Sequence, residues 1–396
     1  MGIRTIIMAG GRGRRLAPLT DFIPKPLVTV ANAPLLGITI DHLVQMGFDD
    51  VDISVGYMAD KICDYVGRNY KTGIRTHKEK EPRGTAGCVR DVPRTKHGDT
   101  LVVSGDILFD LDLSRAVDFH AGSGAAATVV LTRKSDPCRY GTVTLGPSGI
   151  ITGFREKPEW KNVNSDLVST GIYVVSDEVL KMIPGKGECD FARDVFPHLV
   201  GHGLYGIELD GYWNDVGTPE DYRTANLDAA TGKVDSVEKI RLHDGSVVAP
   251  DASVSPSANI SGCVIMGGAT IGDGVHACRA IVGAGAKIGD RCTLYPSSCV
   301  APDAVLPPDT EFGDTPTVTG QTDGTMNVRS AAHTIGELIR HGAQECESGA
   351  MLDFDFGRVT VECSDEHTLV LRAEADNRSD AALSYKYAVR GISVIE

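Results

Sequence analysis

The sequence of 396 residues lacks a long apolar run, and this absence excludes a membrane-spanning helix. A helix needs about 20 apolar residues to cross a bilayer, and no stretch here reaches about 18. The first apolar run, Ile3–Ala9, is too short for a signal peptide and leads directly into charged residues. We therefore expect a cytoplasmic protein that binds no membrane.

Paired cysteines and an excess of basic charge are also missing. The ten cysteines are scattered without a Cys-x-x-Cys pair, and the 11 histidines show no ligand spacing. We therefore expect reduced thiols rather than disulfides or a zinc site. The net charge of −14 argues against nucleic-acid binding, which needs a basic face. A hydrophobic content of 42% is typical of a globular chain with two or three domains.

A glycine- and arginine-rich segment follows the first apolar run. It reads Gly10-Gly11-Arg12-Gly13-Arg14-Arg15, and Pro24-Lys25-Pro26 comes shortly after it. Glycines let the backbone approach a phosphate, and arginines supply charge and forked donors. The segment has neither the Gly-Lys-Ser/Thr of a Walker loop nor the Gly-x-Gly-x-x-Gly of a dinucleotide site. These parts suit a nucleoside triphosphate, although an ordinary turn with solvated arginines would carry the same glycines.

Residues 1 to about 230 alternate short apolar runs with helical segments. The helix expected at Leu35–Met46 has apolar residues on one shared face. This alternation predicts an α/β domain with a Rossmann-like, mostly parallel sheet that binds ligands beyond the carboxyl ends of its strands. The expected strands include Ile3–Ala9, Val51–Val55, Leu101–Ser104, Ala126–Leu131 and Val168–Val175.

An aliphatic residue recurs at every sixth position from Val248 to Val300, with small residues between. Two five-residue units, Met266–Thr270 and Ala277–Ile281, interrupt this period. The pattern predicts a parallel β-helix and resembles the hexapeptide repeats of left-handed β-helices. A Gly/Ala-rich loop is the alternative, but such a loop would not hold its phase over so many units.

The N-terminal segment as a whole resembles the signature of sugar-1-phosphate nucleotidyltransferases, also called NDP-sugar pyrophosphorylases. In that family Gly-Gly-x-Gly-x-Arg-Leu-x-Pro-Leu-Thr precedes Pro-Lys-Pro, and every element is present here. The resemblance implies that Arg15 stabilises the departing pyrophosphate and that Lys25 steadies the α-phosphate. It also implies phosphate contacts from the glycines Gly10, Gly11 and Gly13.

Two aspartates stand at the family's metal-binding positions. Asp106 ends Val103-Ser-Gly-Asp106, and Asp215 lies in Gly211-Tyr-Trp-Asn-Asp-Val-Gly. Each alone could be a turn residue or a helix cap. The resemblance implies that both bind Mg2+, which needs only one or two carboxylates beside substrate oxygens.

The sugar side of the expected site rests on three stretches. Phe154-Arg-Glu-Lys-Pro158 matches the family's Glu-Lys-Pro. The resemblance implies that Lys157 aligns the sugar phosphate and Glu156 accepts a sugar hydroxyl. Gly141 matches a backbone contact to the sugar. Ser169 and Thr170 complete this side, and Ser169 stands where relatives carry Asn.

The base side is expected in Glu81-Pro-Arg-Gly-Thr-Ala-Gly87. Its Gly-Thr-Ala-Gly form resembles that of mannose-1-phosphate guanylyltransferases and favours GTP. By that resemblance, Gly84, Thr85 and Gly87 border the base and ribose, with Glu81 beside them. Arg83 departs from the common Leu of this stretch, and Arg14 departs from the usual Thr of the phosphate loop.

The implied reaction is transfer of GMP from GTP to a sugar 1-phosphate, with release of pyrophosphate. Mannose 1-phosphate is the first choice of acceptor. Because Ser169 is shorter than Asn, a heptose, a modified hexose or a cyclitol 1-phosphate is an open alternative. A non-catalytic regulatory subunit is disfavoured because Arg15, Lys25, Asp106 and Asp215 are all present. An acyltransferase β-helix is disfavoured because its only histidine, His276, lacks an evident partner.

The expected domain plan has three domains joined by two linkers. The tail is expected to be a small α+β domain with a helix over His333–Cys346 and strands at Arg358–Glu362 and Thr368–Ala373. It faintly resembles the last domain of phosphohexomutases but lacks their phosphate loop, so we expect a non-catalytic remnant. We expect a homo-oligomer supported by the β-helix. The segments are 1–230 (nucleotidyltransferase), 231–245 (linker), 246–314 (β-helix), 315–325 (linker) and 326–396 (tail).

Overall fold

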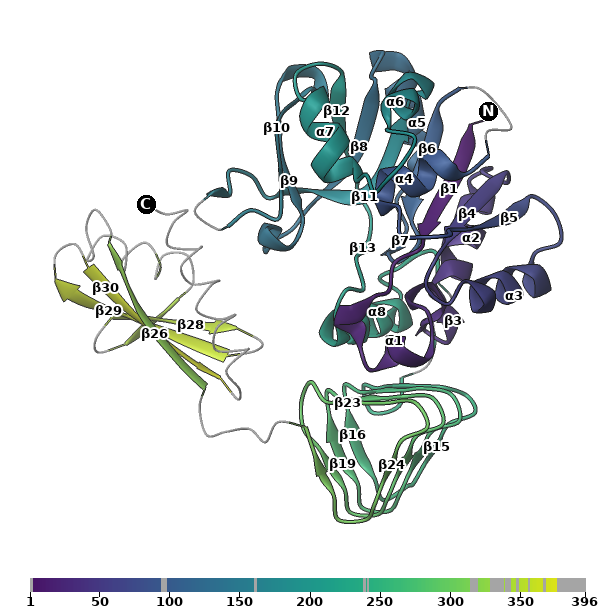
Figure 1. The fold of residues 1–396 in the computed structure, drawn as a ribbon. Coiled ribbons are helices and arrows are strands. Elements are labelled where there is room, and N and C mark those ends of the chain that lie inside the picture. Colours follow the sequence, from purple (N-terminus) through teal and green to yellow (C-terminus); the bar gives the residue numbers. More distant parts are fainter. Residues whose placement is uncertain are drawn as a thin grey trace. The chain divides into compact units, whose positions relative to one another are not determined.

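The computed structural model forms two compact units, Met1–Thr310 and Glu311–Glu396 (Figure 1). No helix among the described residues is long and apolar enough to span a bilayer. The described residues are 3–93, 98–159, 162–237, 240, 242–313, 320–327, 338, 343–346, 349–354, 357–365 and 368–375.

A nine-stranded mixed sheet forms the centre of the first unit. Its order is β10-β9-β11-β6-β1-β4-β5, with β8 pairing with β11 and β12 pairing with β8. The neighbours β6, β1, β4 and β5 are parallel, and β12 is parallel to β8. β11 runs antiparallel to β6, β8 and β9. The strands are β1 (Arg4–Ala9), β4 (Val51–Val55), β5 (Ile74–Lys78), β6 (Thr100–Ser104), β8 (Ala127–Arg133), β9 (Gly141–Leu145), β10 (Ile151–Glu156), β11 (Leu167–Val175) and β12 (Leu204–Glu208).

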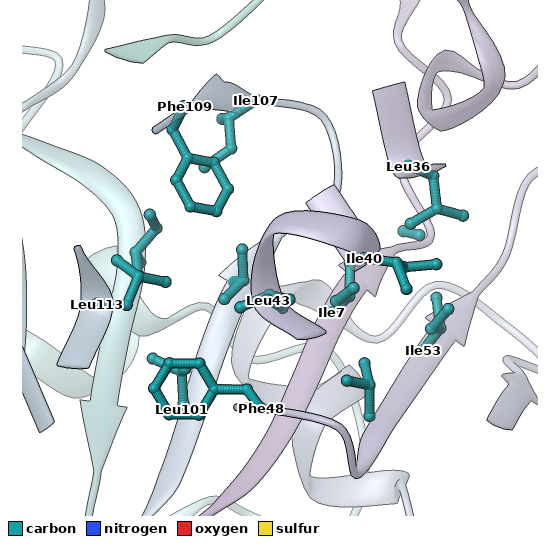
Figure 2. Close-up of a cluster of buried hydrophobic side chains, with 14 of the residues drawn as sticks. Ile7, Leu36, Ile40, Leu43, Phe48, Ile53, Leu101, Ile107, Phe109 and Leu113 are labelled. Carbon is teal, nitrogen blue, oxygen red and sulfur yellow. The ribbon is translucent and has the colours of Figure 1, made fainter. Parts of the chain in front are cut away.

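Helices cover both faces of this sheet, as a doubly wound fold requires. On one face α2 packs Leu36, Ile40 and Leu43 against Ile7 and Ile53 of the sheet (Figure 2). These residues recur at helical spacing, so the predicted shared face of this helix is confirmed. The helices are α1 (Leu19–Phe22), α2 (Leu35–Gln45), α3 (Ala59–Asn69), α4 (Gly84–Asp91), α5 (Leu113–Ser123), α6 (Asp177–Met182), α7 (Phe196–Leu199) and α8 (Pro219–Thr231).

Short elements connect the sheet and helices and carry much of the polar chemistry. They include the turns η1 (Arg14–Leu16), η2 (Lys25–Leu27), η3 (Pro137–Arg139) and η4 (Pro147–Gly149), and the π-helix η6 (Phe191–Val195). Two small ribbons pair β2 (Thr29–Val30) with β3 (Ala33–Pro34), and β7 (Leu108–Phe109) with β13 (Trp213–Asn214).

The repeat region folds into the predicted left-handed parallel β-helix, with three four-stranded sheets. Val247 pairs with Val264, and Val264 with Ile281, so these coils hold 17 residues. Three full hexapeptides would give 18, so each of these coils contains one five-residue unit. The pairing of Val248 with Ile265 and of Ile265 with Val282 places these units at 260–264 and 277–281. The unit predicted at Ala277–Ile281 is therefore confirmed, whereas the one predicted at Met266–Thr270 is wrong. The strands are β14 (Val247–Val248), β15 (Ser253–Val254), β16 (Asn259–Ser261), β17 (Val264–Ile265), β18 (Thr270–Ile271), β19 (His276–Cys278), β20 (Ile281–Val282), β21 (Lys287–Ile288), β22 (Thr293–Leu294), β23 (Cys299–Val300), β24 (Val305–Leu306) and β25 (Glu311–Phe312).

The second unit contains a five-stranded antiparallel sheet in the order β26-β30-β29-β28-β27. The strands predicted at Arg358–Glu362 and Thr368–Ala373 lie within β29 and β30, respectively. The strands are β26 (Gly320–Asn327), β27 (Gln344–Cys346), β28 (Gly349–Phe354), β29 (Gly357–Asp365) and β30 (Thr368–Ala375).

Two expectations about the tail need correction. A helix was expected over His333–Cys346. Its last three residues, 344–346, instead form strand β27, which pairs with β28. Most of the remainder of that helix lies outside the described residues. Residues 320–325 were expected in a linker, but they form part of β26. Their Gly- and Thr-rich composition favours a linker, but β30 supplies hydrogen-bond partners for their backbone N–H and C=O groups, so they form a strand. Residues 315–319 lie outside the described residues.

Candidate active site

Two adjoining cavities open at the carboxyl ends of the parallel strands. The loop cavity, about 650 Å³, is bordered by the residues after β1, β4, β5 and β6, among them Gly10, Tyr57, Glu79 and Asp106. The strand cavity, about 500 Å³, is bordered by Gly141, Glu156, Lys157 and Ser169. Both cavities are lined by Lys25, Thr85, Ser104, Asp106 and Asp190.

The glycine-rich loop begins where β1 ends, and its glycines have different structural roles. Gly10 and Gly11 border the loop cavity, whereas Gly13 borders neither cavity. Gly13 has a φ of 65°, and a Cβ there would lie 3.0 Å from the Lys25 Cβ. Gly13 therefore lets the loop pass close to Lys25, and its contact with phosphate stays a prediction.

The arginines of this loop project separately. Arg12 places its guanidinium 5.3 Å from the ring centre of Tyr57, a cation–π contact beside the loop cavity. Arg14 borders the same cavity. Arg15 lines the strand cavity, and its Nη2 lies 3.8 Å from an oxygen of Asp215. The loop thus offers cations to both cavities.

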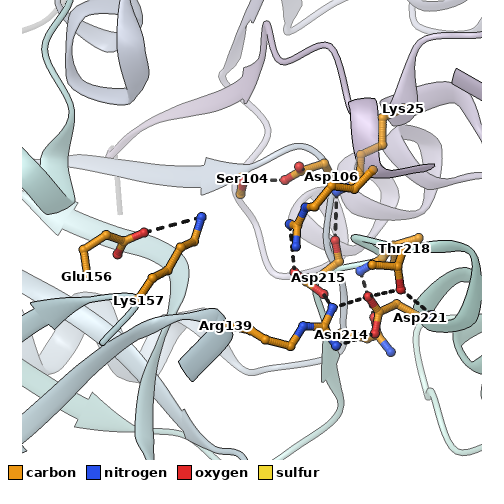
Figure 3. A network of polar contacts seen from close by, with 12 residues as sticks. Lys25, Ser104, Asp106, Arg139, Glu156, Lys157, Asn214, Asp215, Thr218 and Asp221 are labelled. Atoms are coloured by element: carbon orange, nitrogen blue, oxygen red, sulfur yellow. Dashed lines mark hydrogen bonds and ion pairs between the residues drawn. The ribbon is translucent and has the colours of Figure 1, made fainter. Parts of the chain in front are cut away.

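Lys25 joins the two predicted metal ligands (Figure 3). Its Nζ donates to Asp106 Oδ2 at 2.8 Å and to the backbone oxygen of Asp215 at 2.9 Å. Ser104 donates to the other oxygen of Asp106 at 2.6 Å. Burial by itself would raise the pKa of Asp106, but the charge and hydrogen bond of Lys25 hold this pKa below its ordinary value. Asp106 is therefore a carboxylate at neutral pH.

Asp215 lies opposite Asp106, between two arginines. Its Oδ2 faces Arg15, and its Oδ1 lies 3.8 Å from Arg139. The buried Oδ1 has no hydrogen-bond partner within the described part of the chain. Burial, followed by repulsion from Asp221, raises the pKa of Asp215. A buried carboxylate oxygen without a partner is costly unless something binds it.

These carboxylates fit a hard divalent cation. Asp106 and Asp215 line the same cavity and offer only oxygen donors, which Mg2+ prefers. The unpartnered Oδ1 of Asp215 is a vacant donor atom at that place. No group of three or more His, Cys, Asp or Glu side chains among the described residues is arranged to hold a metal ion. A cation held here would therefore complete its coordination with water and substrate oxygens.

Glu156 and Lys157 stand at the far side of the strand cavity, where β10 ends (Figure 3). Lys157 Nζ lies 3.7 Å from Glu156 Oε1, and the Lys157 backbone N–H donates to Tyr140 at 3.0 Å. Burial raises the pKa of Glu156. A Cβ on Gly141 would lie 2.9 Å from the ends of the Glu156 and Phe154 side chains, so a larger residue here would displace both of them.

Ser169 and Thr170 belong to β11, which forms the floor of the strand cavity. Ser169 lines the cavity. The hydroxyl of Thr170 donates to Val130 at 2.8 Å, and its backbone oxygen accepts from the Trp213 indole at 2.9 Å. Thr170 therefore holds the neighbouring strand and ring, and its hydroxyl is already committed.

The Gly84–Gly87 stretch forms the start of α4, and another segment occupies its N–H groups. Asp190 Oδ1 accepts from both the N–H and the hydroxyl of Thr85, each at 3.0 Å. The Cys189 carbonyl accepts from Ala86 and Gly87 at 2.8 and 3.0 Å. Gly84 and Thr85 border the loop cavity together with Glu81, whereas Gly87 borders neither cavity. The Gly87 N–H is thus bound to Cys189, and contact of Gly87 with the nucleotide stays a prediction.

Glu79 is a site residue that the sequence reasoning missed. Its carboxylate lies beside Gly10 in the loop cavity and accepts from the Ser54 hydroxyl at 3.0 Å. Burial raises its pKa. Its position directly after a parallel strand, β5, is the feature of the sequence from which it could have been predicted as a cavity residue. Asp190 and Arg139 were also missed, because only long-range packing brings them to the cavities.

Comparison with known proteins agrees with this geometry. A family model described as nucleotidyl transferase matches residues 4–232. A mannose-1-phosphate guanylyltransferase of Mycobacterium tuberculosis is 31% identical over 300 residues, which cover 74% of this chain and 83% of that protein. A UTP–glucose-1-phosphate uridylyltransferase of Synechocystis sp. is 31% identical over 322 residues, which cover 75% and 81%.

A solved Bacillus anthracis structure, described as a glucose-1-phosphate thymidylyltransferase in complex with sucrose, superposes with a TM-score of 0.51. It shares 26% identity and covers 57% of this chain and 94% of that one. The names of these relatives differ in nucleotide and in sugar, but they describe one kind of transfer. The chain belongs to the nucleotidyl transferase family and is an enzyme of the sugar-1-phosphate nucleotidyltransferase kind.

Proposed function

We propose that this chain transfers GMP from GTP to a sugar 1-phosphate and releases pyrophosphate, with Mg2+ held by Asp106 and Asp215. The observation that carries the proposal is the Lys25–Asp106–Asp215 centre at the junction of two cavities. A nucleotide in the loop cavity and a sugar phosphate in the strand cavity would meet there. A phosphate oxygen of the sugar phosphate attacks the α-phosphorus, and the bond to the β-phosphate oxygen breaks.

The chain's own residues neutralise and align two anions that repel each other. In this proposal Lys25 contacts the α-phosphate and Lys157 the incoming phosphate. The resemblance to the family assigns the departing pyrophosphate to Arg15, although Arg15 lines the strand cavity and Arg12 and Arg14 are the arginines that border the loop cavity. Bound magnesium would supply further positive charge to the phosphate oxygens. No general base is required, because the sugar phosphate is already an anion.

Glu79 supports GTP as the nucleotide. A carboxylate only accepts hydrogen bonds, and guanine presents two adjacent donors, N1–H and its amino group. Uracil and thymine flank their single N–H donor with carbonyl oxygens, which a carboxylate repels. The guanylyltransferase relative at 31% identity points the same way. The uridylyltransferase relative, also 31% identical, is the reason for testing other nucleotides.

Mannose 1-phosphate is the proposed acceptor. Ser169 lines the cavity in place of the longer Asn of the family pattern, so a heptose, a modified hexose or a cyclitol 1-phosphate is the alternative acceptor. Each of these acceptors would undergo the same transfer of a nucleotidyl group to its phosphate.

Pyrophosphate release with magnesium tests the proposal. The full chain would be assayed with GTP, dTTP, UTP, CTP and ATP against mannose, glucose, heptose and cyclitol 1-phosphates. We expect release with GTP and mannose 1-phosphate. Release with GTP and another acceptor would revise the sugar alone, and release with another nucleotide would overturn the role of Glu79. No release from protein that binds nucleotide would overturn the proposed activity.

A further inference from the structure

The β-helix contacts the catalytic domain at the helix that follows the metal carboxylate. Asp215 stands between β13 and α8, and α8 begins four residues later, at Pro219. Asp215 Oδ1 has no hydrogen-bond partner among the described residues, and the two arginines nearest its carboxylate are 3.8 Å away. Its position therefore depends on how the backbone on either side of it is held.

Two neighbouring carboxylates in the first turn of α8 face different parts of the molecule. Asp221 turns toward the site, where it accepts from Arg139 Nη1 at 3.0 Å and from the Thr218 hydroxyl at 2.7 Å. Glu220 turns toward the β-helix, where its Oε1 lies 3.3 Å from Arg279 Nη2. The same turn thus holds Arg139 beside Asp215 and contacts the β-helix.

The contact with the β-helix uses two stacked corners of adjacent coils. Gly262 and Arg279 both have left-handed φ values, 61° and 48°. The Gly262 carbonyl accepts from Arg223 at 3.1 Å, and Arg223 is paired with Glu220. The Arg223 side chain is 12% exposed, whereas Arg279 and Glu220 are 29% and 43% exposed, so Arg223 lies within the contact and the Arg279–Glu220 pair lies at its edge.

Apolar packing supports the same joint. Tyr222 and Ala225 of α8 are fully buried in one cluster with Val264 and Ile281 of the β-helix. Leu16, next to Arg15, belongs to this cluster as well. The β-helix therefore lies directly behind the phosphate loop and the first turn of α8.

We propose that the β-helix positions the metal-binding carboxylate, with Arg279 acting through Glu220 and the first turn of α8 on Arg139 and Asp215. Arg279 is a positioning residue, because it lines neither cavity. Misplacing reacting groups by about 1 Å can cost a factor of about 100 in rate, so loss of this contact has a measurable consequence. The inference rests on the proposed function for the metal-binding role of Asp215 and for its kinetic readout.

The test compares R279M with R291M in the full chain. Arg291 is a matched control, because it is also a left-handed corner of the β-helix (φ 57°) and pairs with Asp309 within the β-helix at 2.7 Å. Mn2+ binding to the protein alone is measured by the loss of the free Mn2+ EPR signal, and kcat and KM are measured separately. We expect R279M to weaken Mn2+ binding by about threefold to tenfold and to lower kcat by about tenfold. KM for GTP is expected to stay within about twofold, and R291M to match the wild type.

Two further variants separate positioning from general stability. R279K is expected to keep Mn2+ binding within about twofold, and E220Q to weaken it as R279M does. The R279M/E220Q double variant is expected to be no worse than either single one, as for residues that act through one contact. Equal Mn2+ binding by R279M, E220Q and R291M would overturn the inference. If the wild type binds Mn2+ but releases no pyrophosphate, the proposed function fails and the Mn2+ titrations still decide the inference.

Discussion

Lys25 is buried between two prolines and connects groups that lie far apart in the chain, Asp106 and the Asp215 backbone. We expect Lys25→Ala and Asp106→Ala to lower turnover by a factor of order 100 or more, as when other electrostatic stabilisers are removed. The measurement is the initial rate of pyrophosphate release with GTP and the acceptor that works best. Lys61→Ala, an exposed lysine on α3, is the matched control. Near-normal turnover in either site variant would count against the assignment.

Glu79 gives a second prediction at this scale, on nucleotide choice and pH. Glu79→Gln replaces an acceptor by a mixed donor and acceptor, so we expect kcat/KM for GTP to fall by about tenfold or more relative to UTP and dTTP. Glu178→Gln, an exposed change on α6, is the control. Unchanged nucleotide preference in Glu79→Gln would show that another group reads the base.

The pH dependence follows from burial of the Glu79 carboxyl. Burial raises the pKa of Glu79 above its ordinary value of 4.5. The accepting carboxylate exists only above this raised pKa, so kcat/KM for GTP is expected to fall as pH is lowered through it. Glu79→Gln removes this group from the acid limb of the profile. The measurement is kcat/KM for GTP against pH for the wild type and for Glu79→Gln, with unfolding monitored at each pH. The fall of kcat/KM toward acid pH should be present in the wild type and reduced in the variant.

At the scale of elements, a buried charge cluster joins three parallel strands on the side away from the cavities. Asp52 of β4 accepts from Arg4 of β1 at 3.1 Å, and from Arg75 and His77 of β5 at 2.8 Å each. Asp52 is 1% exposed and Arg4 is 4% exposed, so removal of the carboxylate would leave the buried Arg4 guanidinium without its charged partner. We expect Asp52→Asn to lower the free energy of unfolding by about 3 kcal/mol. Urea unfolding measures it, and exposed Asp60→Asn is the matched control.

The pH dependence of this stability has a definite sign. Burial would raise the pKa of Asp52, but hydrogen bonds from Arg75 and His77 bring it below its ordinary value of 3.8. Its contribution is therefore present above about 3.8 and is lost as pH falls through the lower folded value. The difference between wild type and Asp52→Asn should stay constant near neutral pH and shrink below about pH 4. A difference that grows toward acid pH would contradict the assignment.

The elements that could be predicted are those with a repeated local pattern. The face of α2 and the aliphatic positions of the β-helix were predictable because each is repeated along consecutive residues. The antiparallel direction of β11 was not predictable from its composition, since a buried strand has the same residues in either direction. The strand at 320–325 was missed for a related reason, because its partner β30 lies far along the chain.

For the whole molecule, the division into two units leads to a truncation prediction. The candidate site and its supporting core lie within Met1–Thr310. A chain ending at residue 313 is therefore expected to keep kcat within about twofold. A chain ending at residue 232 is expected to lose its fold or its activity, because Val247, Val264 and Ile281 complete the core behind Leu16. Pyrophosphate release and thermal unfolding check both. We propose that the chain self-associates through the β-helix. Light scattering of the chain ending at residue 313, which keeps the β-helix, is expected to give the same oligomer as the full chain, and a monomer would contradict this.

The sequence by itself determined those features of this protein that depend on neighbouring residues. The glycines and arginines after the first strand, the alternation of strands and helices, and the period of six are properties of neighbouring residues. Such properties follow from backbone freedom and from the spacing of side chains along one element. They were sufficient for the family signature and for most of the elements.

Only the tertiary structure decided which side chains meet. Asp106 and Asp215 come together because Lys25 contacts both, and Glu79 enters the loop cavity because β5 lies beside β4. The N–H groups at the start of α4 are taken by Cys189 and Asp190 rather than left for a ligand. Each outcome depends on packing between segments distant in sequence, and a pattern of neighbouring residues carries no information about that packing.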